Sequence, residues 1–161
     1  MQTFMTSATY ATTASTLDRL RLNKQALEGW QIMMTNLKLD PQGNHREPRG
    51  WYNHPAVKMW RGYEVALSEY VVAMCDEWRS RGYNTTIADK ALATIEKAIS
   101  LGLVSGEYVA PHWQGDSDYL DSITSSHRVA LLNKNYEWYS QFGWAEDTGE
   151  RPDSYDYVWA V

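Results

Sequence analysis

Apolar residues recur at steps of three and four along most of this chain, and the period-two alternation of half-buried strands is nearly absent. This spacing gathers apolar side chains on one face of each of several α-helices. The pattern predicts four main helices, over residues 15–38, 55–81, 86–102 and 118–134, followed by an aromatic segment at 136–144 and an apolar tail at 155–161. We therefore expect an all-α fold in a single compact helical domain.

The length and composition fit one domain, which we expect to span residues 1–161. Hydrophobic residues make up 43% of the chain and charged residues 22%, which excludes a wholly disordered chain. The loops predicted at 39–50 and 144–153 are too short to separate two domains. Because no run of about 18 apolar residues and no signal-peptide pattern occurs, we expect a cytoplasmic protein without a membrane span. The lone Cys75 excludes an internal disulfide.

Charge divides unevenly along the chain. Residues 1–80 hold nine Lys and Arg against eight Asp and Glu, whereas residues 81–161 hold six against twelve. Phosphate contacts supply most of the non-specific affinity for nucleic acids, so an acidic surface of this kind is not a general polyanion binder. Any nucleic acid must therefore meet a local patch.

Three titratable residues interrupt the apolar stripes of the predicted helices. Lys24 lies between Leu20 and Leu27 at helical spacing, and Glu64 and His127 hold equivalent positions in the second and fourth helices. We expect all three to face inward, where an unpaired charge is too costly to persist. Each is therefore predicted to be paired or to have a shifted pKa.

Two interpretations of these residues stay open. One is a structural network, such as a buried ion pair between Lys24 and Glu64 with His127 beside it. The other is a polar ligand pocket, because converging polar groups within apolar walls are typical of binding sites. Its expected lining is Arg21, Lys24, Glu28, Glu64 and His127, with Trp60 and Tyr63 as walls.

The segment before Pro55 offers a further candidate. Asn53 or His54 suits the cap of a helix that Pro55 begins, while a loop-borne His54 also suits hydrogen-bond donation to a ligand oxygen. A metal site built from His112, Asp116, Asp118 and His127 is disfavoured, since no zinc-binding spacing occurs. We predict no metal and no cofactor.

Several segments resemble the pyrimidine-dimer DNA glycosylase superfamily of the phage endonuclease V type. The most specific are Gly-Trp-Tyr-Asn-His-Pro at 50–55 and Glu-Trp-Arg-Ser-Arg-Gly-Tyr-Asn at 77–84. Residues 20–31 resemble the family's first helix, and residues 111–112, 126–128 and 136–139 resemble its C-terminal portion. The chain is also similar to a bacterial and phage branch that begins Met-x-Thr-Phe and carries a Ser-His-Arg motif.

This resemblance implies an all-α enzyme that flips a nucleotide out of duplex DNA and attacks C1′ of the damaged sugar with an N-terminal amine. The resulting Schiff base permits strand cleavage by β-elimination, and the family's catalytic glutamate falls on Glu28. An α-amine with an ordinary pKa near ~7.7 is a substantial nucleophile at neutral pH. The residues expected to bind DNA or a nucleotide are Arg21, Asn53, His54, Trp60, Tyr63, Glu64, His127 and Arg128.

The chain departs from the family pattern in two respects. Position 2 is the bulky Gln2, where the family exposes the amine of a small residue, so Met1 or Lys24 is the expected amine. The acidic surface also differs from the basic surface of well-known members. A second hypothesis is therefore a protein that binds a nucleotide or modified nucleoside through His54, Trp60 and Arg128 on the same scaffold, without lyase activity.

Overall fold

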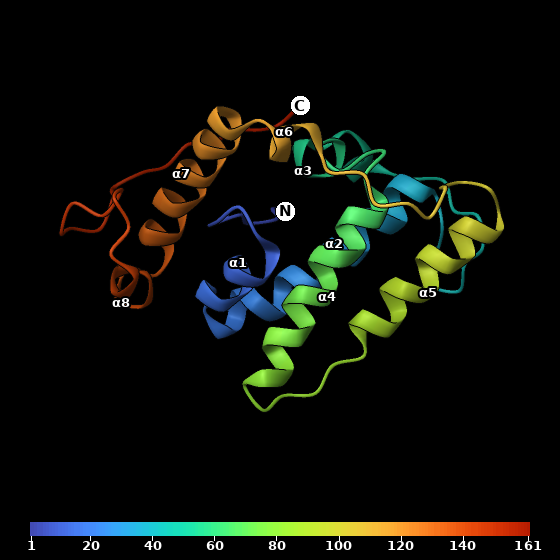
Figure 1. The fold of residues 1–161 in the computed structure, drawn as a ribbon, viewed down its shortest axis with the longest axis horizontal. Coiled ribbons are helices and arrows are strands. Elements are labelled where there is room, and N and C mark those ends of the chain that lie inside the picture. The colour runs from blue at the N-terminus through green and yellow to red at the C-terminus, as the bar shows by residue number, and fades with distance from the viewer.

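The computed structural model describes residues 1–161 and consists of helices joined by loops (Figure 1). The α-helices are α1 (Tyr10–Thr16), α2 (Arg19–Leu37), α3 (Pro55–Lys58), α4 (Glu64–Ser80), α5 (Ile87–Ser100), α6 (His112–Gly115), α7 (Ser117–Lys134) and α8 (Tyr136–Tyr139), with 3-10 turns at Gly50–Asn53 and Ser140–Phe142. No strand forms beyond one isolated bridge between Leu39 and His45. The all-α prediction is confirmed. None of the helices is both long and apolar enough to span a bilayer.

The helices α2 and α4 form the central pair, and α1 and α5 pack against it. Helix α7 lies on the other side of the N-terminal segment (Figure 1). At the crossing of α2 and α4, a Cβ added to Gly29 would lie 2.6 Å from Cγ2 of Val71. Only a glycine therefore permits this approach of the two backbones.

The first two predicted helices are each divided. Residues 15–38 form the end of α1 and then α2, because the chain turns at Leu17, which is fully buried, and Asp18, whose carboxylate accepts a hydrogen bond from Tyr139. Residues 55–81 form α3 and α4, separated at Gly62, where φ is +87°. Such a φ suits glycine and ends a helix. The predictions for α5 and α7 hold to within two residues at their ends.

The predicted burial of α2 is partly wrong. Leu20 is 78% exposed, and the Lys24 side chain is 69% exposed rather than inward-facing. The core side of α2 carries Leu22, Ala26 and Met33. Leu20 and Lys24 stay exposed because the first turns of α2 border a cavity, which leaves one side of the helix without a packing partner there.

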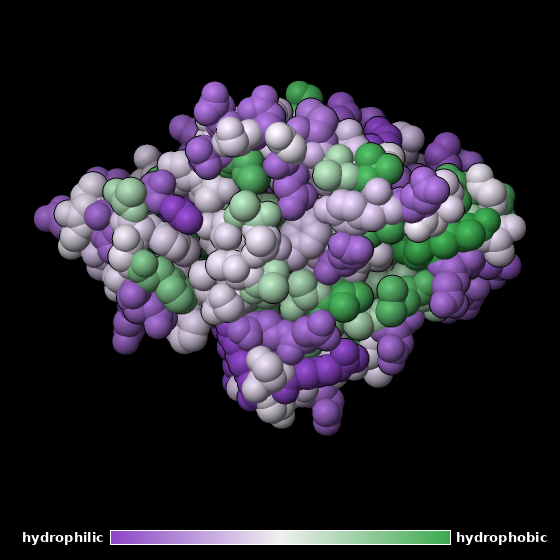
Figure 2. Space-filling view, in the orientation of Figure 1, coloured by the Kyte–Doolittle hydropathy of each residue, from purple (hydrophilic) through white to green (hydrophobic).

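Glu64 and His127 are buried as expected, His127 completely. In α5 the core contact comes from Ile95, whereas Leu92 and Ile99 stay partly exposed. Figure 2 shows hydrophobic atoms gathered on the side of the molecule where α5 lies. The apolar residues of α5 thus cover a wider face than the one that the helix buries.

The N-terminal segment, defined here as residues 2–6, runs through the middle of the fold in an extended conformation and is buried throughout. It has no strand partner. Side-chain acceptors take its backbone N–H groups instead: Glu28 for Gln2, Gln2 for Thr3, Gln25 for Phe4, His127 for Met5 and Thr13 for Thr6. Buried backbone groups need such partners, so polar side chains on α1, α2 and α7 are part of the core.

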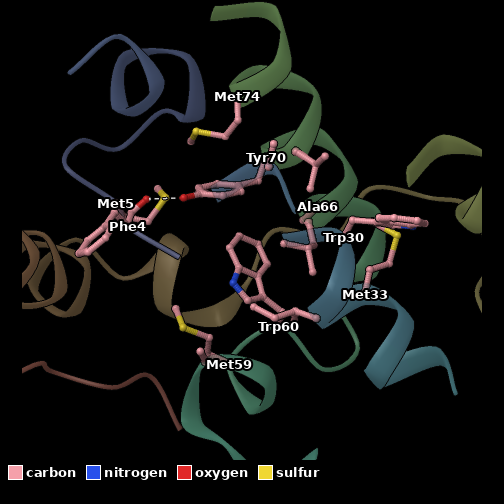
Figure 3. Packing of buried hydrophobic residues seen from close by; sticks show 14 of the residues in the cluster. Phe4, Met5, Trp30, Met33, Met59, Trp60, Ala66, Tyr70 and Met74 are labelled. Carbon is pink, nitrogen blue, oxygen red and sulfur yellow. Dashed lines mark hydrogen bonds between the residues drawn. The ribbon is translucent and has the colours of Figure 1, made fainter. Parts of the chain in front are cut away.

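Aromatic and sulfur-containing side chains fill the space around this segment (Figure 3). The Tyr70 hydroxyl donates to the Phe4 carbonyl over 2.8 Å, and its ring packs on Trp60 at 5.6 Å between centroids. The Trp60 indole N–H donates to the Thr3 hydroxyl over 2.8 Å. Aromatic residues with a polar group suit this core because the buried backbone needs donors as well as apolar contact.

The close crossing at Gly29 yields a first prediction. Alanine normally favours a helix over glycine by about 1 kcal/mol. At Gly29 we expect the opposite, a net loss of about 1 kcal/mol in the free energy of unfolding, because the new methyl overpacks against Val71. Urea denaturation of Gly29→Ala tests this. Gly115→Ala is the control, since nothing lies within 4 Å of its added Cβ; equal effects at both positions contradict the prediction.

The buried His127 yields a prediction on pH. Burial lowers its pKa from 6.5 to about 3, so between these values the unfolded chain binds a proton that the folded chain excludes. The stability that the neutral His127 contributes is complete above pH 6.5 and is lost as the pH falls toward 3. Over this range the free energy of unfolding falls by up to about 1.4 kcal/mol per pH unit.

The matched variant is His127→Asn, whose amide oxygen can still accept the Met5 N–H but does not titrate. From pH 7 to pH 5, urea denaturation should show the wild-type free energy of unfolding falling by about 2 kcal/mol more than that of the variant. Parallel losses in the two proteins contradict a buried neutral histidine.

Candidate active site

A cavity of about 390 Å³ opens where the N-terminal segment meets the first turns of α2 and the C-terminal tail. It combines apolar, cationic and acidic side chains: Met1, Gln2, Phe4, Leu20, Arg21, Lys24, Gln25, Glu28, Lys134, Tyr155 and Tyr157. The volume lies in the range of small-molecule and nucleoside pockets. Four of the predicted site residues, Met1, Arg21, Lys24 and Glu28, are brought together here.

Glu28 is the buried carboxylate of this cavity, with 8% of its surface exposed. Its Oε2 accepts from the Gln2 backbone N–H at 3.3 Å and from the Gln25 amide at 3.5 Å, while its Oε1 lies 3.6 Å from Nζ of Lys24. These contacts are long for charge-assisted hydrogen bonds. The carboxylate is therefore surrounded by donors without being saturated by any of them, so it can still interact with a cation that enters the cavity.

The N-terminal residue shares this cavity with the carboxylate. The N–H of Gln2 contacts Glu28, and Met1, one residue earlier, lines the cavity. The Gln2 side chain uses its oxygen to accept from Thr3, and its buried Nε2 has no partner. A buried donor without a partner is costly, and such groups are concentrated at functional sites.

Lys24 lies at the rim of the cavity. Its only ion pair is with Glu28 on the next turn of α2, so the buried ion pair with Glu64 that the sequence suggested is wrong. Its ammonium also remains in solvent rather than desolvated. Arg21 lines the same rim, with its guanidinium 3.2 Å from the Asp18 carboxylate. The two side chains give the rim a positive charge beside an acidic floor.

The C-terminal tail supplies the aromatic side of the cavity. The Lys134 ammonium lies 4.9 Å from the centre of the Tyr155 ring, and the presence of this cation lowers the pKa of the Tyr155 hydroxyl. Burial raises the pKa of Tyr157, which packs against the rings of Phe4 and His127. Flat rings next to cations are suited to stacking with a base or a sugar.

His54 has the first of the two roles that the sequence allowed, that of a helix cap. Its Nδ1 accepts the Ala56 N–H over 3.0 Å and so caps α3. In the neutral ring the proton is then on Nε2, which is free to donate. The ring lies between Trp51 and Trp159, at 5.2 and 5.6 Å between centroids. Partial burial, and then the positive N-terminus, lowers its pKa, while Glu28 opposes the shift.

The structure does not gather all predicted residues into one pocket. Trp60 and His127 lie in the core around the N-terminal segment. Tyr63 and Glu64 border a separate hollow of about 200 Å³, where the Glu64 carboxylate accepts from the Gly62 N–H over 3.0 Å. The single-pocket prediction is therefore wrong for these four residues.

Two further candidates lie outside the cavity. Arg128 donates from Nε and Nη2 to the Thr6 carbonyl at 3.0 and 2.7 Å and pairs with Glu146 at 3.4 Å, so its visible contacts hold the N-terminal segment. Asn53 is exposed in the 3-10 turn before His54, and it does not cap α3. No three His, Cys, Asp or Glu side chains lie close enough together to hold a metal ion.

Sequence reasoning missed Gln2, Gln25, Tyr155 and Tyr157. Gln25 carried a usable signal: it lies three residues after Leu22 and four before Gly29, on the buried face of α2. Its oxygen accepts from the Phe4 N–H and from the Tyr70 hydroxyl, at 2.8 and 2.9 Å. The tyrosines lacked such a signal because the tail has no helical period.

Comparison with known proteins adds an independent finding. A family model described as pyrimidine dimer DNA glycosylase matches residues 1–91, which include the N-terminal segment, α2, α3 and α4. No curated protein and no solved structure matches the chain. Since the family model covers more than half of the 161 residues, including Met1, Glu28 and His54, the chain belongs to the pyrimidine dimer DNA glycosylase family.

Proposed function

We propose that this protein is a DNA glycosylase that excises a damaged pyrimidine base and then cleaves the resulting abasic strand through a Schiff base. The observation that carries the proposal is the contact between the N-terminal segment and the buried carboxylate of Glu28, 3.3 Å from the Gln2 nitrogen. A nucleophilic amine and a carboxylate at one cavity are the two groups that this chemistry needs. Membership of the family supports the same reaction class.

The reaction begins when the amine lone pair attacks C1′ of the damaged nucleotide. The glycosidic bond breaks with its electron pair on the base, which takes up a proton. The attacking nitrogen gives up one proton, and the C1′–O4′ bond then breaks as O4′ takes up a proton, which leaves a protonated imine whose positive charge the Glu28 carboxylate stabilises. Loss of a C2′ proton expels the 3′ phosphate and cleaves the strand, and water finally releases the amine. Glu28 is the proposed carrier of these protons.

The amine we propose is that of the N-terminal residue, Met1 in this chain. Met1 lines the cavity next to the floor carboxylate, whereas Lys24 is bound to the rim and its ammonium stays hydrated. Lys24 and Arg21 then act on the phosphates beside the flipped nucleotide. His54, with Nε2–H free, donates to a ligand oxygen at the rim.

The carboxylate role predicts the effect of Glu28→Gln. This change keeps the shape of the side chain but removes the charge that stabilises the imine, so we expect excision to fall by about 10²–10⁴-fold. Single-turnover cleavage of a duplex with a thymine dimer measures the rate, and circular dichroism checks the fold. Glu64→Gln is the matched control, because this buried carboxylate caps Gly62 in another hollow. Equal rates for Glu28→Gln and wild type contradict the assignment.

The amine role predicts a covalent product. Borohydride reduces an imine to a stable amine, so wild-type protein with an abasic duplex should yield an adduct that peptide mass spectrometry assigns to the N-terminal peptide. Lys24→Arg should give the same adduct in similar yield. An adduct on Lys24 would reassign the nucleophile. Absence of any adduct, while a known glycosylase is trapped in parallel, would leave a nucleotide-binding protein without lyase activity.

A further inference from the structure

A second concave surface lies at the opposite end of α2 from the cavity. This groove has a volume of about 540 Å³ and is formed by the last turns of α2 and the loop after it. Its lining is Met34, Thr35, Arg46, Glu47, Pro48, Arg49 and Trp51. It is larger than the cavity at Glu28 and is open to solvent along exposed residues of the loop.

The two arginines of the groove are free to bind an anion. Neither Arg46 nor Arg49 forms an ion pair, and the one carboxylate of the groove, Glu47, is bound to His45 at 2.7 Å. The loop itself is fixed, since the Arg46 N–H donates to the Lys38 carbonyl over 2.8 Å. Two unpaired guanidinium groups on an anchored loop provide a prepared site for phosphate oxygens.

Trp51 joins this groove to the proposed active site. Its side chain is 52% exposed, and its ring contacts His54, which in turn contacts Trp159. An exposed indole beside cations is a stacking surface for nucleotides. Trp159 in turn packs on Tyr157, which lines the cavity, so a row of four rings leads from the groove to the cavity.

The distribution of charge favours DNA as the occupant. Residues 38–61 contain five Lys and Arg and only two Asp and Glu, in a chain whose net charge is −5. A DNA strand is repelled by the acidic residues of the second half and attracted to this segment. Along α2, eleven residues separate Lys24 at the cavity from Thr35 at the groove, or about 16 Å. That length corresponds to about five base-pair steps.

We propose that the groove is a second DNA contact, in which Arg46 and Arg49 bind backbone phosphate near the lesion and Trp51 packs against the adjoining nucleotide. The inference rests on the proposed function, because it takes DNA bound at the cavity as its starting point. It explains how a chain with an acidic surface holds a duplex: the contact is concentrated in one segment rather than spread over the molecule.

The first test is the salt dependence of binding. Fluorescence anisotropy with an abasic-analogue duplex gives Kd at several salt concentrations for wild type and for Arg46→Gln/Arg49→Gln. We expect the variant to bind at least about tenfold more weakly at low salt, with a slope of log Kd against log salt that is smaller by about 2. Lys90→Gln/Arg151→Gln removes the same charge elsewhere and should change the slope much less.

The second test locates the phosphate. Single methylphosphonate substitutions, which remove one phosphate charge, are placed at each position up to about seven steps on either side of the lesion. For wild type we expect weaker binding at one or two positions about five steps away. The double arginine variant should be insensitive at those positions and unchanged at the others. Trp51→Ala should weaken binding about tenfold without altering the salt slope.

The inference is overturned if the double arginine variant keeps the wild-type Kd and salt slope, or if it stays as sensitive as wild type to every methylphosphonate. These outcomes are separate from failure of the proposed function, which borohydride trapping measures. If wild type forms no adduct, but the arginine variant binds a plain duplex more weakly than wild type, the groove proposal stands and the proposed lyase chemistry is wrong. If wild type forms the adduct, but the variant binds as tightly as wild type, the lyase chemistry stands and the groove proposal is wrong.

Discussion

The extended N-terminal segment is buried without a strand beside it, and the rest of the fold is arranged to satisfy its backbone. Five consecutive N–H groups each need an acceptor away from water, and they find it in side chains from three helices and from the segment itself. A helical protein would otherwise keep such acceptors on its surface. Here Gln25 and His127 occupy core positions because the segment requires them.

The same need for hydrogen-bond acceptors determines where the groups of the proposed active site lie. Glu28 accepts the first of these N–H groups and also forms the floor of the cavity, so one side chain belongs to both the core and the proposed site. The buried segment fixes Gln2 beside that carboxylate and brings Met1 to the same cavity. Precise placement of reacting groups by a rigid surround is a large part of catalytic power. In this fold the placement of Gln2 depends on the core that encloses the residues that follow it.

Sequence reasoning predicted the helical class, the helices α5 and α7, the family, and the burial of Glu64 and His127. It failed at Lys24 and Leu20, because periodicity identifies a face of a helix but not what that face meets, and the start of α2 meets a cavity. It also predicted one continuous helix where α1 ends and α2 begins, since the turn at Leu17 depends on Tyr139, a partner 121 residues after Asp18. A contact between residues so far apart in the sequence cannot be predicted from the local pattern around either residue.

Gln25 shows the same limit in another form. A glutamine on a buried helical face is visible in the sequence, but its role depends on an extended segment that propensity and periodicity do not place. The groove around Arg49 and Trp51 was equally hidden, because it arises from the packing of a loop on the end of α2. Both sites come from tertiary contacts of irregular backbone, the part of a fold that patterns describe least well.

The burial of the N-terminal segment has a consequence for biosynthesis. Met5 and Thr6 are made before His127 and Arg128, which hold them and follow 122 residues later. At about 5–20 residues per second the segment waits roughly 6–25 s for these partners. The acceptors on α1 and α2 are made soon after the segment, so during that interval only the contacts with α7 are missing. The enclosure of the segment is therefore complete only when α7 has been made.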